Sequence, residues 1–216
     1  IDRVISVSDA QSFYRTRQVS REEGLLIGGS CGTAVDVAIT VATELTKDDL
    51  VVVLLPDSGR GYLSKIFNDK WMTEYGFLME EGPKIQDVLE YKENTISQLV
   101  YVQPDDSVSK AIELLQEHNL SRIIVAQGTL PLSAAEIKGT IDEEYLQAKA
   151  LEEDVLEMKC SELMGPRMSF VGSGESVGSV LIKLEQEHTL LVMDKGRPYS
   201  VVSASDVMSY LESMER

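Results

Sequence analysis

Two short segments rich in glycine and serine carry residues that could contact a ligand. The segment GGSCG, residues 28–32, follows the apolar residues LLI, and PDSGRG, residues 56–61, follows VVVLL. A glycine pair lets a ligand approach the backbone without steric cost, and a serine before a helix either caps the helix or hydrogen-bonds a bound group. Both segments come after runs typical of strands, at the edge where open α/β sheets bind ligands. The pattern indicates a ligand site at this edge.

An α/β sheet would position these two segments at the ends of neighbouring strands. Residues 1–79 alternate between strand-like and helical stretches, as such a sheet requires. We expect strands at VISVS, LLIGGS and VVVLLP. The uninterrupted apolar run of the last is typical of a strand buried on both faces of a mainly parallel sheet. We expect helices over DAQSFYRTRQVSREEG, with Asp9 as a candidate cap, and from about Gly32 to Leu45.

An internal repeat follows from about residue 84. The stretch that begins at Leu89 aligns with the stretch that begins at Met164. Each copy has an apolar turn, a short strand, a turn ending in Ser-Val, an amphipathic helix ending in Glu-His, a strand, and a closing strand and helix. We expect a pseudo-twofold pair of β-α-β-β-α units, joined by a long helix over Asp142–Met158 with a charged, solvated face.

Composition excludes several classes of partner. The chain has 20 Lys and Arg against 36 Asp and Glu, a net charge of −16, which repels nucleic acid and anionic lipid surfaces. No apolar run reaches the length of a membrane span, and the start does not read as a signal peptide. Cys31 and Cys160 are far apart, which fits a reducing, cytoplasmic location. We also expect residues preceding Ile1, because the chain starts within a strand-like segment.

The phrase LPDSGRGYLSKIFNDKWMTEYGFL, together with GGS before a helix, resembles the pyridoxal-phosphate enzymes of the cysteine synthase and cystathionine β-synthase group, the latter in particular. The resemblance covers about residues 1–79 and implies the C-terminal part of the catalytic domain. It places Ser30 at the pyridine nitrogen of pyridoxal phosphate, with Gly29, Pro56 and Asp57 also at the cofactor. A neutral hydroxyl makes the ring a weaker electron sink than a carboxylate would, which favours β-replacement.

No catalytic residue is identified, since the resemblance puts the Schiff-base lysine upstream of Ile1. We therefore expect the chain alone to be catalytically silent. The other reactive side chains have simpler interpretations. Lysines 47, 65 and 70 are expected on the surface, Cys31 in packing, and His118 and His188 at helix ends, with no metal site.

The repeat resembles the paired regulatory modules named after cystathionine β-synthase, the Bateman module, over about residues 84–213, with copies at about 84–148 and 158–213. In that family a Gly-x-apolar-Ser/Thr-x-x-Asp signature holds the ribose of an adenosyl ligand. SVVSASD has Ser203 and Asp206 at the hydroxyl and carboxylate, whereas GTIDEEY has Asp142 and Tyr145. The resemblance also implies contacts from Leu120, Ser121 and Arg122. A Ser-x-x-Asp helix cap without ligand is the alternative interpretation.

Taken together, the resemblances imply part of an enzyme that condenses serine with homocysteine to cystathionine, or releases hydrogen sulfide from cysteine. A homodimer or larger homo-oligomer is expected. S-Adenosylmethionine is the first expectation for the regulatory ligand. Its lead over AMP is narrow, because the positive charge of Arg122 disfavours a sulfonium cation and favours a phosphate. Two alternatives stay open: a binding module without catalysis, and a cysteine synthase that uses an activated serine.

Overall fold

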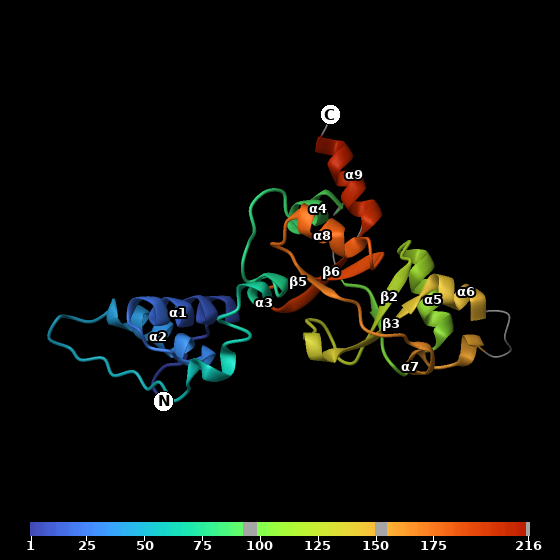
Figure 1. The fold of residues 1–216 in the computed structure, drawn as a ribbon. Coiled ribbons are helices and arrows are strands. Elements are labelled where there is room, and N and C mark those ends of the chain that lie inside the picture. The colour runs from blue at the N-terminus through green and yellow to red at the C-terminus, as the bar shows by residue number, and fades with distance from the viewer. Residues whose placement is uncertain (93–98, 150–154, 215–216) are drawn as a thin grey trace. The chain divides into compact units, whose positions relative to one another are not determined.

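The computed structural model describes residues 1–92, 99–149 and 155–214. The chain forms two compact units, Ile1–Thr73 and Glu74–Arg216, which we call the N-terminal unit and the repeat unit. Figure 1 shows the elements of each unit. None of the described helices is long and apolar enough to cross a membrane.

Two packed helices form the centre of the N-terminal unit. Helix α1, Asp9–Glu22, begins with a capping box in which the Ser8 side chain accepts a hydrogen bond from the Gln11 N–H. The cap is therefore Ser8, and the expectation that Asp9 caps the helix is wrong. In helix α2, Gly29–Ala42, Gly32 allows a close approach to α1, since a Cβ there would lie 2.2 Å from the Ser12 carbonyl oxygen. The short helices η1, Gly59–Tyr62, and α3, Asp69–Glu74, follow.

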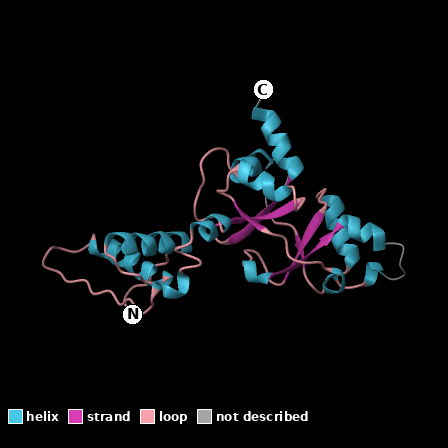
Figure 2. Ribbon diagram, viewed as in Figure 1, coloured by secondary structure: helices cyan, strands magenta, loops and turns pink. Residues whose placement is uncertain are grey.

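The three strands expected in residues 1–79 are not formed, so the expectation of a mainly parallel sheet is wrong for this part of the chain (Figure 2). Residues 1–8 are irregular, and LLIGGS contributes only an isolated bridge between Ile27 and Ser58. The run at 51–55 is irregular too, with Val52 84% and Leu54 80% exposed. A strand needs hydrogen-bonded neighbours, and no described segment pairs with this run.

The repeat unit contains two sheets of identical topology. In each, the first strand runs parallel to the second, and the second runs antiparallel to the third. The strands are β1, Tyr101–Val102, β2, Arg122–Ala126, β3, Ile137–Asp142, β4, Phe170–Gly172, β5, Thr189–Asp194, and β6, Arg197–Ser203. The helices of the two copies are α5, Val108–Glu117, α6, Glu143–Lys149, α8, Val177–Leu184, and α9, Ala204–Met214, with short turns η2, Ala134–Glu136, and η3, Val155–Glu157. Both copies thus have the expected β-α-β-β-α order.

The helix that precedes each copy packs on the other copy. Helix α4, Ile85–Lys92, places Ile85 and Val88 in the core of the second copy, together with Val202. Helix α7, Cys160–Leu163, places Cys160 in the core of the first copy. Helices α4 and α7 are thus exchanged between the copies: α4 completes the core of the second copy, and α7 completes the core of the first.

A third cluster joins the two sheets. Ile124 of β2 and Ile137 of β3 pack with Leu191 and Met193 of β5, and all four side chains are fully buried. The two copies therefore share one continuous core between their sheets.

The expectation of one long helix over Asp142–Met158 is wrong. Asp142 belongs to β3, where it lies opposite Arg122 in the β2–β3 register. The helix that follows is α6, which ends at Lys149, and Val155–Glu157 forms the short η3. Residues 150–154 lie outside the described residues. Pairing with β2 holds Asp142 in a strand despite the helix-favouring residues after it.

Candidate ligand sites

The structure brings GGSCG and PDSGRG together in the N-terminal unit. The Gly28 N–H donates to the Asp57 carbonyl oxygen at 3.1 Å, and the Gly59 N–H donates to the Leu26 carbonyl oxygen at 3.0 Å. A Cβ on Gly28 would lie 2.2 Å from Asp57 Oδ2, so a larger residue there would have to displace the Asp57 carboxylate. The two segments meet as the sequence indicated, although the strands expected to carry them are absent.

The residues expected at pyridoxal phosphate lie around this junction. Ser30 is exposed in the first turn of α2, directly after the buried Gly29. Pro56 is exposed and Asp57 is half-buried, with Asp57 Oδ2 accepting a 2.6 Å hydrogen bond from the Tyr62 hydroxyl. That hydrogen bond, with the charge of Asp57, raises the pKa of Tyr62. Ser30 thus presents a neutral hydroxyl at the surface, as a contact to the ring nitrogen requires, whereas the space beside Gly29 is filled by the Ile66 and Phe13 side chains.

The other reactive side chains of the sequence lie outside this arrangement. The Cys31 thiol is buried and donates to the Asp57 carbonyl oxygen at 3.3 Å, a packing position. Lys47, Lys65 and Lys70 are all exposed. His118 is the C-cap residue of α5, as expected, whereas His188 is exposed in the connection before β5. Among the described residues, no cluster of His, Cys, Asp or Glu could hold a metal ion.

The repeat unit contains a cavity of about 700 Å³ lined by both copies, which we call the second-copy cavity. The first copy contributes Leu120, Ser121 and Arg122 at the start of β2, and the second contributes Ser203 and Asp206. All five residues expected at an adenosyl ligand therefore line one cavity. Its volume lies within the range usual for small-molecule sites.

Ser203 and Asp206 also cap helix α9. Asp206 Oδ2 accepts hydrogen bonds from the Ser203 N–H at 2.8 Å and from the Ser203 hydroxyl at 2.7 Å. The Ser203 hydroxyl lies 2.8 Å from the Ser205 hydroxyl. The Ser-x-x-Asp cap is thus formed, and its hydrogen bonds fix the Asp206 carboxylate at the cavity wall.

Lys92, the last residue of α4, was missed by the sequence reasoning. Its ammonium lies 2.9 Å from Asp206 Oδ2 and 3.3 Å from the Val201 carbonyl oxygen, in the wall of the second-copy cavity. The Lys92 and Asp206 side chains are 27% and 18% exposed, so the pair is partly shielded from solvent. No local pattern signals this contact, because Lys92 reaches Asp206 only through the exchange of α4.

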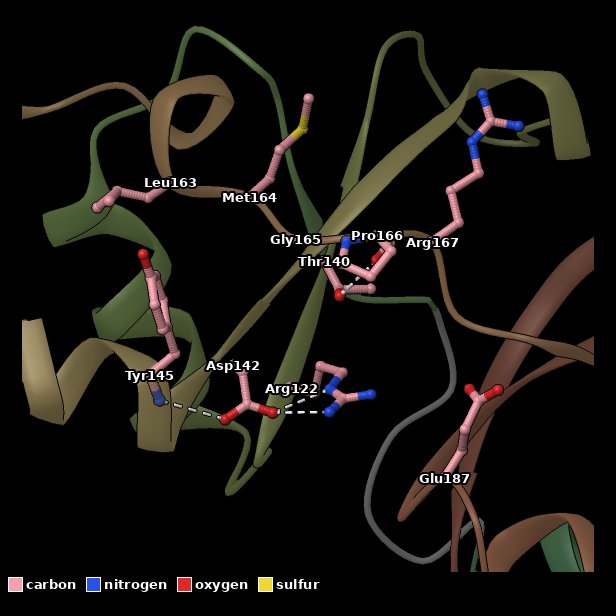
Figure 3. A pocket seen from close by; sticks show the side chains of 10 residues that line it. All are labelled: Arg122, Thr140, Asp142, Tyr145, Leu163, Met164, Gly165, Pro166, Arg167 and Glu187. Atoms are coloured by element: carbon pink, nitrogen blue, oxygen red, sulfur yellow. Dashed lines mark hydrogen bonds and ion pairs between the residues drawn. The ribbon is translucent and has the colours of Figure 1, made fainter.

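A further cavity of about 680 Å³, the first-copy cavity, lies beside the end of β3 (Figure 3). Asp142 and Tyr145, the counterparts of Ser203 and Asp206, both line it, with Thr140. Asp142 Oδ2 accepts two hydrogen bonds from the Arg122 guanidinium, at 2.8 and 3.0 Å. Arg122 lines both cavities, whereas its ion-pair partner Asp142 lines the first-copy cavity.

Replacing Arg122 with glutamine is expected to raise the pKa of Asp142. Burial alone raises this pKa, but the hydrogen bond and charge of Arg122, with the N–H groups of Tyr145 and Glu144, bring it below its ordinary value of 3.8. Because the folded-state pKa is the lower one, the pair stabilises the fold above about pH 4, and this contribution is lost as the pH falls through the folded-state pKa. NMR titration of the Asp142 carboxyl group checks this.

Arg167→Gln is the matched control, since Arg167 lines the same cavity on its other side (Figure 3). This control is expected to leave the pKa of Asp142 near its value in the unaltered protein. An unchanged pKa in Arg122→Gln would show that the ion pair does not hold this carboxylate in its charged form.

Comparisons with known proteins found relatives that align with nearly the whole chain, and a family model that matches part of the repeat unit. Residues 88–131 match the CBS domain family. The cystathionine beta-synthase of Oryctolagus cuniculus is 28% identical over 99% of this chain and 41% of its own length. That of Dictyostelium discoideum is 26% identical over 98% of this chain and 44% of its own length. The chain thus spans less than half the length of these curated relatives.

Among solved structures, a protein with CBS domains from Burkholderia ambifaria MC40-6 matches with a TM-score of 0.52 at 18% identity. The match covers 62% of this chain and 96% of that protein. At this identity the likeness shows a shared fold. The α/β arrangement of the matched part of the chain is therefore one that a CBS-domain protein adopts.

Proposed function

Because the chain resembles cystathionine beta-synthases along nearly its whole length and carries a CBS domain, we propose that it is part of such an enzyme. The whole enzyme depends on pyridoxal phosphate and condenses serine with homocysteine, or releases hydrogen sulfide from cysteine. The repeat unit binds an adenosyl ligand in the second-copy cavity and regulates that reaction. The two roles belong to different units and are tested separately.

The observation that carries the regulatory role is the convergence of Leu120, Ser121 and Arg122 with Ser203 and Asp206 on one cavity. A carboxylate accepts hydrogen bonds from the two hydroxyls of a ribose, and Asp206 is held in place by the cap it makes to α9. Leu120 supplies apolar surface for a base in the same cavity. Such a ligand changes activity only if it binds two conformations of the enzyme unequally, and typical couplings are about 5- to 150-fold.

The residues of the N-terminal unit support the catalytic role. Pyridoxal phosphate, when bound, supplies an electron sink for the amino-acid substrate. Ser30, exposed in the first turn of α2, would donate or accept the hydrogen bond at the ring nitrogen. The Tyr62 hydroxyl fixes the Asp57 side chain, and the Gly28 N–H, which donates to the Asp57 carbonyl oxygen, holds the PDSGRG segment against GGSCG.

Replacing Ser30 with alanine in the full-length protein is expected to cut β-replacement turnover by about tenfold, because the hydrogen bond to the ring nitrogen is lost. Ser30 is exposed, so the fold is expected to be unaffected. The measurements are steady-state kinetics and the cofactor absorption spectrum. Ser64→Ala, at another exposed serine, is the control and is expected to retain turnover. Unaltered turnover and absorption in Ser30→Ala would refute the assignment.

Calorimetric titration of the chain with S-adenosylmethionine, AMP and ATP tests the regulatory role. At least one is expected to bind, and Asp206→Ala is expected to weaken that binding by about tenfold or more, since a charge-assisted hydrogen bond is lost. Asp87→Ala is the matched control, because Asp87 accepts the Lys84 N–H in a cap of the same kind away from the cavity. Absence of binding by all three would refute the role, and binding unchanged in Asp206→Ala would place the site elsewhere.

A further inference from the structure

Lys92 lies in the wall of the second-copy cavity, where its positive charge acts on a ligand bound there. Its ammonium is 2.9 Å from Asp206 Oδ2, the carboxylate that the proposed function assigns to the ribose. It also donates to the Val201 carbonyl oxygen at 3.3 Å, so two contacts fix its position in the cavity wall. With Lys92 and Asp206 only 27% and 18% exposed, solvent screens this position less than it screens an open surface.

The charge balance of the second-copy cavity depends on this lysine. Arg122 is already paired with Asp142, at 2.8 Å. Among the described residues, Lys92 is the cation paired with Asp206 at the cavity wall, and the lining also contains the Glu143 carboxylate. Without it, the wall would present an unbalanced carboxylate, which attracts cations and repels anions.

Adenosyl ligands differ in charge at the 5′ carbon of the ribose. S-Adenosylmethionine carries a sulfonium cation there, and AMP carries a phosphate. The 5′ carbon is attached to the ribose ring that carries the diol, so a ribose held at Asp206 places its 5′ group on the same side of the cavity wall as the Lys92 ammonium, which lies 2.9 Å from Asp206 Oδ2. At short range, like charges repel and a phosphate forms charge-assisted hydrogen bonds with an ammonium.

We propose that Lys92 makes the second-copy cavity selective for adenosyl ligands that carry a phosphate, over the cationic S-adenosylmethionine. This inference rests on the proposed function, since it presumes that the cavity binds an adenosyl ligand. It reverses the order of ligands that the sequence favoured, and it names Lys92 as the residue that determines specificity.

The experiment compares AMP, adenosine and S-adenosylmethionine by calorimetry on the 216-residue chain and its variants. Adenosine has no charge at the 5′ carbon, so it corrects for any general damage to the recognition of base and ribose. AMP is expected to bind about tenfold or more tightly than adenosine, and S-adenosylmethionine more weakly than adenosine. Lys92→Gln is expected to abolish most of both differences, and Lys92→Arg is expected to keep them, because it keeps the charge.

Lys110→Gln is the matched control. Lys110 also pairs with an aspartate, Asp106, at 2.9 Å, but it does not line the cavity. This control is expected to keep the ratio of AMP to adenosine affinity. An unchanged ratio in Lys92→Gln, or equal weakening of both ligands, would overturn the inference while leaving the proposed function intact. Failure of the unaltered chain to bind any of the three would overturn the proposed function itself.

Discussion

Replacing Ile124 with alanine is expected to lower the free energy of unfolding of the repeat unit by about 2–5 kcal/mol. Ile124 lies in β2, is fully buried, and packs in the cluster that holds Leu191 and Met193 of the other sheet. The substitution removes apolar contacts and leaves a cavity between two sheets that backbone pairing holds in place. Relaxation can fill such a cavity only in part, which is why the expected loss is large.

Urea denaturation followed by circular dichroism measures this loss. Fluorescence is the wrong probe, because the single tryptophan, Trp71, lies in the N-terminal unit. Ile182→Ala is the matched control, since Ile182 in α8 is 64% exposed, and its expected cost is below about 0.5 kcal/mol. Similar losses in both variants would contradict the shared core.

Replacing Lys183 with methionine is expected to destabilise the repeat unit by about 2–4 kcal/mol. The Lys183 ammonium pairs at 2.7 Å with Glu175 Oε2, and the Glu175 side chain is only 4% exposed. Glu175 Oε1 accepts the Gly172 N–H at 2.9 Å, so the carboxylate is anchored to the end of β4. Removing the lysine leaves this buried negative charge without its cation. Because Lys183 itself is 33% exposed, the expected value lies below that of a fully buried pair.

Lys159→Met provides the control in the same urea experiment. Lys159 pairs with Asp105 at 2.7 Å, but the two side chains are 58% and 83% exposed. Exposed pairs of this kind contribute at most about 1 kcal/mol. If both lysine variants lose the same small amount, the Glu175 pair does not stabilise the fold as its burial indicates.

Local signals predicted α1, α2 and the repeat, since each depends on residues close together in the chain, but they also predicted a helix from Asp142, which lies in β3. The two Ser-Val turns are examples, because Ser107 and Ser176 each cap the helix that follows. Alignment of the copies predicted the β-α-β-β-α order for the same reason. The strands of residues 1–79 could not be predicted in this way. An apolar run such as 51–55 becomes a strand only if another segment pairs with it, and its own residues do not determine that.

The candidate sites follow the same rule. Ser203 and Asp206 are three residues apart and were predicted from a local motif, and the structure places them in one cavity with Leu120, Ser121 and Arg122. Lys92 is separated from Asp206 by 114 positions and reaches it only because α4 packs on the second copy. The sequence analysis placed the residues of α4 in the first copy, so it could not predict a contact between Lys92 and the second copy.

Amide NMR spectra of the chain with and without saturating AMP test whether an adenosyl ligand occupies the second-copy cavity. We expect the largest shifts at the amides of Leu120, Ser121, Arg122, Val202 and Ser203, which line this cavity. Shifts confined to Thr140, Tyr145 and the stretch from Leu163 to Arg167, around the first-copy cavity, would contradict this occupancy, as would a spectrum that AMP leaves unchanged.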